Sequence, residues 1–301
     1  MALKETYPSS FRLACGEILK FLSARTPMSL WMITRVSGDE WTILDAVDNH
    51  YGLQPMEVYD WSVSFSYRMV LGLGPKVAPR CSEVPAYVNS PAYSIAQIGA
   101  YIGVPLELPN GKLFGILTGI DPEPKKNELH QVLPEIEVYA KGLMHILISE
   151  MQIARLESKI VHMESPHWRD PENDALSFEA WLSDSVDADW ARVNHLDPGG
   201  IIYLQLPSER TATNLVLSKI RDIFKDAGEI YCDETGNFFI MLRGLIRDEQ
   251  IALTKDIRKT LSKIIPEAKI AHVYRDPKTT MSSALAIAKA QIRSRRQKSA
   301  A

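Results

Sequence analysis

The chain has 301 residues, 46% of them hydrophobic, and a formal net charge of −3 at neutral pH. This length leaves room for two domains, while the weak negative charge gives no electrostatic reason to expect a nucleic-acid partner. No apolar run approaches the ~20 residues that span a membrane, and the first ten residues lack the apolar core of a secretory signal. Cys15, Cys81 and Cys232 fit neither a disulfide framework nor a metal spacing. We therefore expect a cytoplasmic protein with no membrane contact, metal or other cofactor.

The N-terminal part predicts a helix followed by a hairpin. Apolar residues recur at helical spacing from Phe11 to Leu22, with Ser9 or Ser10 as the N-cap. Two strand-like runs follow at residues 29–36 and 40–46, and the Ser-Gly-Asp between them suits a turn.

A second hairpin is predicted farther along the chain. Two apolar runs, at residues 98–108 and 113–120, flank the tetrapeptide Pro-Asn-Gly-Lys. Asn110-Gly111 is a strong hairpin signal because both residue types tolerate the positive φ of a tight turn. Apolar side chains throughout both runs indicate that these strands lie deep in a sheet.

These elements resemble the GAF family of small-molecule sensor domains. The second hairpin through Pro124 carries most of the likeness, and shorter blocks at residues 59–70 and 84–87 extend it. The resemblance implies an antiparallel sheet with flanking helices over residues 1–127.

GAF ligands lie between the sheet and the helices of one face, so the resemblance also implies pocket residues. Here these are Trp61, Phe65 and Arg68 from the middle helical region, with Tyr101 and Thr118 from the central strands. Arg68 could pair with an anion and Trp61 could stack on a ring. Alternatively, Trp61 and Phe65 are core residues four apart on one helical face. Some GAF domains bind no ligand and serve as dimer scaffolds.

Residues 128–165 predict a long connecting helix. Its apolar residues alternate spacings of three and four, as in a coiled-coil seam: Leu129, Val132, Ile136, Tyr139, Leu143 and Ile146, then Ile153, Leu156, Ile160 and Met163. The simpler interpretation of the first half is a helix that packs on its own sheet. The second half has no predicted partner in its own domain, so we expect a parallel homodimer there. His162 lacks a predicted carboxylate partner and is expected to be structural.

Residues 166–301 alternate predicted helices and strands. Strand-like runs lie at residues 201–206, 229–232, 238–242 and 269–274, and amphipathic runs at 215–224, 249–264 and 281–293. This alternation suits a palm-like sheet with helices on its faces. The segments resemble, in outline, the GGDEF family of diguanylate cyclases. The whole chain is therefore predicted to be α+β. It ends on a basic run expected to be a solvated helix end: Arg293, Arg295, Arg296 and Lys298.

The resemblance places the GGDEF signature on a hairpin turn, where the chain has Thr235, Gly236, Asn237, Phe238 and Phe239. Active cyclases need acids from the first strand and from this turn, because two divalent cations are held against a triphosphate. The chain has Gln205 and Pro207 on the strand, and Asn237 and Phe238 on the turn. The segment after the strand is shorter than the family's guanine-reading segment. The product-inhibition motif, expected near residues 226–229, lacks its arginine. No catalytic residue is therefore predicted.

The prediction is a regulatory protein that is not an enzyme: a GAF-like sensor or dimerisation domain, a connecting helix, and a degenerate GGDEF-like domain. One alternative is a divergent cyclase that makes cyclic di-GMP from GTP and holds metal at Asp233 and Glu234. Another alternative is a ligand-free dimer scaffold. The sequence identifies neither a GAF ligand nor a downstream protein partner.

Overall fold

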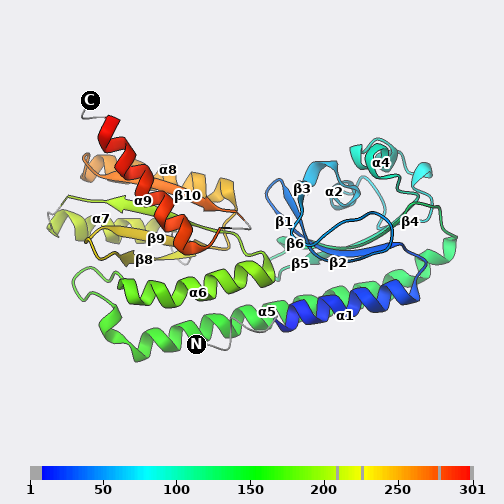
Figure 1. Ribbon diagram of the computed structural model, residues 1–301, viewed down its shortest axis with the longest axis horizontal. Coiled ribbons are helices and arrows are strands. Elements are labelled where there is room, and N and C mark those ends of the chain that lie inside the picture. The colour runs from blue at the N-terminus through cyan, green and yellow to red at the C-terminus, as the bar shows by residue number, and fades with distance from the viewer. Residues whose placement is uncertain (1–8, 208–209, 225–226, 277–278, 299–301) are drawn as a thin grey trace. The chain divides into compact units, whose positions relative to one another are not determined.

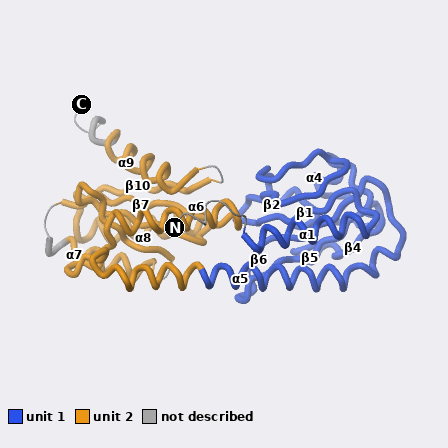
Figure 2. Tube along the Cα trace, turned by 60° about the horizontal axis from the view of Figure 1, so that its bottom comes forward, with its two compact units in different colours: residues 1–153 blue, residues 154–301 orange. Residues whose placement is uncertain are grey.

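The computed structural model describes residues 9–207, 210–224, 227–276 and 279–298. The chain divides into two compact units (Figure 2), residues 1–153, the first unit, and residues 154–301, the second unit. Each unit combines helices with an antiparallel sheet, so the predicted α+β fold class is confirmed. None of the described helices is long and apolar enough to cross a membrane.

The first unit is built on a six-stranded antiparallel sheet with the order β3-β2-β1-β6-β5-β4 (Figure 1). The strands are β1 (Leu30–Ser37), β2 (Glu40–Asp48), β3 (Val58–Asp60), β4 (Val77–Ala78), β5 (Ala100–Glu107) and β6 (Leu113–Asp121). β6 pairs with both β1 and β5, and every residue of β6 after Leu113 is buried. The second predicted hairpin therefore lies deep in the sheet, as its apolar runs indicated.

The loop of the β5–β6 hairpin differs from the expected tight turn. Among its residues only Gly111 has a positive φ, of +77°, and Asn110 instead accepts a hydrogen bond from the Lys112 amide at 3.0 Å. The Leu108 amide bonds to the Lys112 carbonyl at 2.9 Å. A loop of this length closes with a single left-handed glycine, so only one residue of the Asn-Gly pair needs positive φ.

Helices cover both faces of this sheet. One face carries α1 (Ser10–Arg25) and the first half of α5 (Leu133–Glu164), which follows η3 (Asn127–Val132) (Figure 1). The opposite face carries η1 (Trp61–Val63), α2 (Phe65–Val70), η2 (Cys81–Glu83), α3 (Pro85–Val88) and α4 (Pro91–Ala96). Ser9 caps α1 as predicted, because its side chain accepts from the Arg12 amide at 3.0 Å.

The second unit has a four-stranded antiparallel sheet with the order β10-β7-β9-β8. Its strands are β7 (Gly199–Gln205), β8 (Gly228–Cys232), β9 (Phe238–Arg243) and β10 (Lys269–Arg275). Its helices are η4 (Pro166–Trp168), α6 (Phe178–His195), α7 (Arg210–Phe224), α8 (Arg247–Ile264) and α9 (Met281–Lys298). α6 and α9 pack on one face, and α7 and α8 on the other. Side chains of β7 and β9 alternate between these two cores, as the two-residue period of a strand requires.

The two halves of α5 differ in their packing. Its buried residues all lie in the first half: Ile136, Ala140, Leu143, Met144 and Leu147. The simpler interpretation of that half, packing within its own domain, is therefore correct. In the second half Ile153, Leu156, Ile160 and Met163 are between 53% and 80% exposed. That half nevertheless has a partner in its own unit, contrary to expectation, because Ser158 and His162 contact Asp184 on α6.

Candidate functional site

The turn between β8 and β9 is organised around the carboxylate of Asp233. Its Oδ1 accepts hydrogen bonds from the Thr235 amide (2.9 Å), the Thr235 hydroxyl (2.6 Å) and the Asn237 amide (3.0 Å). Gly236 has a φ of +76°, which is easy for a residue without a Cβ. An Asp side chain that binds amides two to four residues later closes a turn locally. The sequence around Asp233 therefore folds into this turn largely by itself.

Two side chains from other elements reach the second oxygen of Asp233. Its Oδ2 accepts from the Tyr203 hydroxyl on β7 at 2.8 Å and from Lys289 Nζ on α9 at 2.9 Å. Burial by itself raises the pKa of this carboxyl, but hydrogen bonds from Thr235, Lys289 and Tyr203 outweigh burial and lower the pKa to about 2. Asp233 therefore stays ionised although it is only 5% exposed.

A hollow of about 290 Å³ lies beside this ion pair. The residues that line it are Tyr203, Gln205, Asp233, Thr235, Asn237, Lys289, Ile292 and Arg293. Asp233 is the one carboxylate among the described residues of this lining, and Lys289 already neutralises it. Arg293 adds a second positive charge. The hollow therefore offers cations, amides and hydroxyls, a set of groups that suits an anion.

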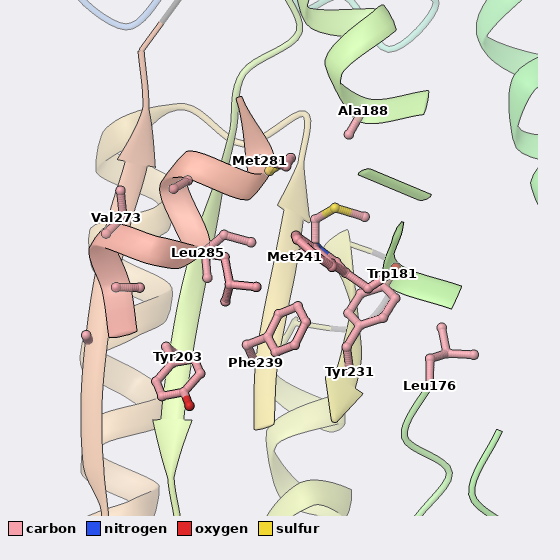
Figure 3. Packing of buried hydrophobic residues seen from close by; sticks show 14 of the residues in the cluster. Leu176, Trp181, Ala188, Tyr203, Tyr231, Phe239, Met241, Val273, Met281 and Leu285 are labelled. Carbon is pink, nitrogen blue, oxygen red and sulfur yellow. The ribbon is translucent and has the colours of Figure 1, made fainter. Parts of the chain in front are cut away.

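The predicted signature residues all lie on this hairpin. Thr235 and Asn237 line the hollow, and Gly236 lies between them in the turn. Phe238 and Phe239 begin β9 and are buried on opposite faces of the sheet. Phe239 stacks on Tyr231 with ring centroids 5.4 Å apart (Figure 3). Both phenyl rings are therefore part of the core.

The predicted strand positions bring no acid to the site. Gln205 ends β7 and lines the hollow, and Pro207 follows it. Within the described ranges, no group of three or more His, Cys, Asp or Glu could hold a metal ion. The shortened segment after β7 includes residues 208–209, and the expected product-inhibition position includes residue 226; both lie outside the described residues.

Sequence reasoning missed Lys289 and assigned Arg293 to a solvated tail. The two cations are four residues apart on α9, and this spacing places them on one face of the helix. The spacing of the two cations could be seen in the sequence, but the residues around them do not show that this face of α9 contacts the β8–β9 turn. The side chains of Arg295, Arg296 and Lys298 lie outside the described residues.

The predicted GAF pocket residues meet in a buried aromatic cluster of the first unit. Trp61, Phe65 and Tyr101 are buried in one hydrophobic core. Phe65 stacks on Tyr87 with centroids 4.6 Å apart and contacts the Tyr101 ring edge-on at 5.8 Å. Ring packing of this kind is typical of a core, and ligand binding by these residues stays a prediction.

Thr118 and Arg68 differ from the other candidates. The Ser66 hydroxyl lies 3.1 Å from the Tyr101 hydroxyl and 3.4 Å from that of Thr118, and all three residues are buried. Arg68 lies over the Tyr67 ring, with Cζ 5.5 Å from its centroid, and its buried Nε has no hydrogen-bond partner among the described residues. Thr118 therefore joins the aromatic cluster through Ser66, whereas the described contact of Arg68 is with Tyr67.

Comparison with known proteins gives no match to a family model and none to a curated protein. Solved structures do match. The GGDEF domain of FimX from Pseudomonas aeruginosa is 13% identical and matches 40% of this chain and 89% of its own, with a TM-score of 0.36. The nlh2 GAF domain of A. aeolicus is 18% identical and matches 49% of this chain and 90% of its own, with a TM-score of 0.38. The coiled coil and GGDEF domain of DgcB from Caulobacter crescentus are 9% identical and match 48% of this chain and 89% of their own, with a TM-score of 0.38. Structures similar to this chain thus include GAF and GGDEF domains, the two kinds that its sequence resembles.

Proposed function

We propose that this chain is a signalling protein in which a GAF-like unit acts through α5 on a GGDEF-like unit that does not make cyclic di-GMP. The observation that carries the proposal is the bonding of Asp233, the one carboxylate that the described residues bring to the lining of the hollow. Two divalent cations at a triphosphate need carboxylate oxygens that are free to bind them.

Asp233 has no free lone pair to offer a metal. A carboxylate has about four acceptor positions, and this one receives five donor contacts from Thr235, Asn237, Tyr203 and Lys289. The divergent-cyclase alternative would have to break the buried ion pair and open the turn. Its other ligand, Glu234, is an exposed residue of the same turn. Gln205 supplies a neutral amide where a strand acid is needed.

Phosphate binding without turnover is a second candidate function of the hollow. Among the lining residues that the structure describes, Lys289 and Arg293 carry two positive charges against the single negative charge of Asp233, so this described lining is cationic on balance. A volume of about 290 Å³ suits phosphate groups better than a whole nucleotide. The hollow would then bind the phosphates of a nucleotide such as GTP and report its presence to the rest of the chain.

For the first unit we propose a dimerisation role, together with the second half of α5. The packing of Phe65, Tyr87 and Tyr101 supports this role, because these rings contact one another within the core. Ile153, Leu156, Ile160 and Met163 recur at coiled-coil spacing and are exposed in the single chain. A second copy of α5 in parallel orientation would cover them.

The test is incubation of the purified chain with GTP and magnesium or manganese, followed by mass spectrometry for cyclic di-GMP. We expect no product above a no-enzyme control, while a known active cyclase run in parallel makes it. Calorimetric titration with GTP in the same buffer separates binding from turnover, and Arg293→Ala should weaken any binding. Turnover that Asp233→Asn or Glu234→Gln abolishes would establish the divergent cyclase instead.

A further inference from the structure

The end of α5 contacts α6 of the second unit through the side chains of Ser158 and His162. Between Arg155 and Glu164 all residues are exposed except Ser158 and His162, which are half-buried. These two residues are four apart and therefore share one face of the helix. Apolar burial contributes little here, so polar contacts such as the bonds of these two side chains are expected to hold this segment in place.

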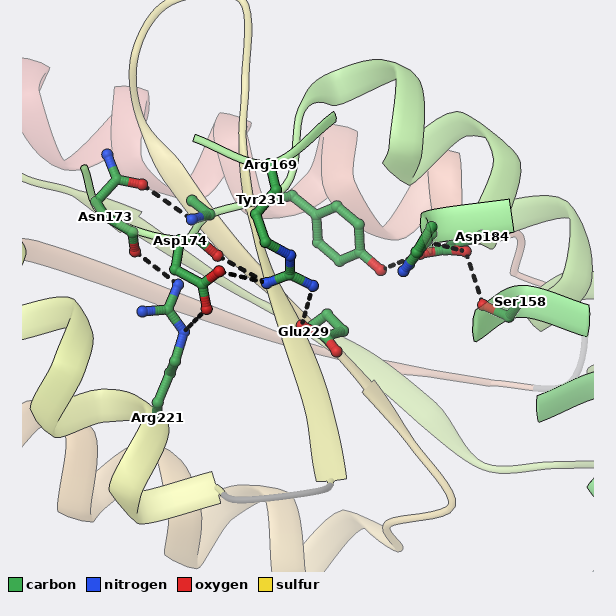
Figure 4. A network of polar contacts seen from close by, with 10 residues as sticks. Ser158, Arg169, Asn173, Asp174, Asp184, Arg221, Glu229 and Tyr231 are labelled. Atoms are coloured by element: carbon green, nitrogen blue, oxygen red, sulfur yellow. Dashed lines mark hydrogen bonds and ion pairs between the residues drawn. The ribbon is translucent and has the colours of Figure 1, made fainter. Parts of the chain in front are cut away.

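Both side chains bind the same buried carboxylate, that of Asp184 on α6. His162 Nε2 lies 3.1 Å from its Oδ2 and 3.2 Å from its Oδ1, and the Ser158 hydroxyl donates to Oδ1 at 3.3 Å. Asp184 is 3% exposed. Figure 4 shows Asp184 between Ser158 on one side and Tyr231 on the other. We call Ser158, His162 and Asp184 the latch.

The groups around His162 favour its protonated form. The hydrogen bond to Asp184 raises the pKa of the imidazole, burial opposes this, and the negative charges of Asp184 and Glu229 on β8 raise it further. Arg169, beyond the end of α5, lowers it. The Trp168 ring contacts the imidazole with centroids 6.1 Å apart and carries no charge. The net effect is a pKa above its ordinary value of 6.5.

Asp184 keeps other partners when the helix end leaves. The Tyr231 hydroxyl on β8 donates to its Oδ2 at 2.6 Å, and Arg243 on β9 donates to its backbone carbonyl at 2.8 Å. Burial acts to raise the pKa of Asp184, but the bonds from His162 and Tyr231 and the charge of Arg243 lower it overall. The carboxylate therefore stays ionised, and the imidazole is the group of the latch that titrates near neutral pH.

We propose that the latch is a pH switch on the connecting helix: protonated His162 holds the end of α5 on α6, and loss of that proton weakens this attachment. The sign follows from the direction of the shift. A group with a raised pKa in the attached state stabilises that state fully below its ordinary pKa, and the stabilisation is lost as the pH rises through the raised value. The latch is thus stronger in mildly acidic conditions and weaker in mildly alkaline ones. The proposed pH switch does not depend on whether the second unit binds or converts a nucleotide.

The latch and the exposed apolar stripe of α5 lie on different faces of the helix. At 100° per residue, Ser158 and His162 lie roughly 100–160° around the helix axis from Leu156, Ile160 and Met163. Release of the latch therefore changes the mobility of α5 without removing the apolar stripe.

The test uses the full chain and two measurements. Carbon-13 labelling of the histidine rings gives the pKa of His162 by NMR, with His162→Gln used to assign its signal. Hydrogen exchange of residues 155–164, divided by the intrinsic rate at each pH, reports attachment between pH 5.5 and 8.5. We expect protection to fall with rising pH by about tenfold for each unit by which the pKa of His162 is raised.

Two variants make the result decisive. His162→Gln should abolish the pH dependence, and because residue 162 lies at the edge of the second unit this variant should still fold. His167→Gln is the matched control, because His167 is an exposed neighbour outside the latch, and it should leave the pH dependence unchanged. A His162 pKa at or below 6.5, or the same pH profile in His162→Gln as in the wild type, would overturn the proposal.

Discussion

Lys289 Nζ lies 2.9 Å from Asp233 Oδ2, so the last helix of the chain is joined by an ion pair to the hairpin turn of the second unit. The same ammonium lies 5.7 Å from the Phe178 ring centroid and 5.8 Å from that of Tyr203. The Asp233 side chain is 1% exposed and that of Lys289 is 28% exposed. The carboxylate of the pair is therefore buried, while the Lys289 side chain keeps partial contact with solvent.

Removal of Lys289 should destabilise the second unit. Lys289→Met takes one charged donor from a buried carboxylate, and we expect a loss of ~2–3 kcal/mol in the free energy of unfolding at pH 7. Urea denaturation measures it. The double variant Lys289→Met with Asp233→Asn should recover part of the loss, because no buried charge is then left unpaired. Equal losses in the single and double variants would contradict this account.

The contribution of Asp233 should disappear in acid. Its pKa is lowered from an ordinary 3.8 to about 2 in the folded chain. A carboxyl with a lowered pKa stabilises the folded state at pH values above its ordinary pKa. This stabilisation is lost as the pH falls from 3.8 toward 2. The difference in stability between wild type and Asp233→Asn should therefore shrink over this pH range. Urea denaturation at pH 7, 4 and 2.5 tests this, and a constant difference would count against it.

Restoring acids to the signature should not restore a cyclase. Asn237→Asp places a carboxylate beside the hollow, but the strand position still holds Gln205. Phe238→Glu places a charge in the core that packs against α7 and α8, so we expect a loss of stability of ~3 kcal/mol or more. Thermal unfolding and the product assay check both statements. Cyclic di-GMP made by a well-folded double variant would refute the prediction.

The exposed stripe of α5 should carry a dimer. Ile153→Ala, Leu156→Ala and Ile160→Ala together remove side chains worth ~2–3 kcal/mol each when fully covered. Sedimentation should then show a monomer where the wild type is a dimer at micromolar concentration. Met151→Ala with Val161→Ala is the matched control, because these residues are 44% and 38% exposed but lie off the stripe. A monomeric wild type, or a triple variant that still dimerises, would exclude this dimer.

Two glycines should respond in opposite directions to the same substitution. A Cβ on Gly103 would lie 2.0 Å from the Tyr101 hydroxyl oxygen, and Phe65 and Tyr87 prevent that ring from moving. Gly103→Ala should therefore destabilise the first unit by ~1–3 kcal/mol. Gly142 on α5 has open space around it, so Gly142→Ala should stabilise by ~0.5–1 kcal/mol. Thermal unfolding compares the two, and equal shifts would contradict the packing of Tyr101.

Local patterns in the sequence were sufficient for several elements of the fold. The Ser9 cap and the period of α1, the Asn110-Gly111 hairpin and the apolar run of β9 each depend on residues within a few positions of one another. Such patterns act through backbone geometry, which neighbouring residues determine. The sequence also showed that positions 205 and 237 carry amides and not acids. This conclusion requires only that Gln205 is placed on the predicted strand and Asn237 on the predicted turn.

Only the tertiary structure brought together Asp233 with Lys289, and His162 with Asp184. Each pair joins residues far apart in the chain, and each depends on how a helix packs against a sheet or against another helix. The isolated pattern around His162 gave no sign of a carboxylate, because Asp184 belongs to the next helix and faces it only after folding. Burial then determines the chemistry of Asp233 and Asp184. Because water is excluded from both carboxylates, the few donors that reach each one determine its charge. At Asp233 these donors also occupy the lone pairs that a metal ion would need.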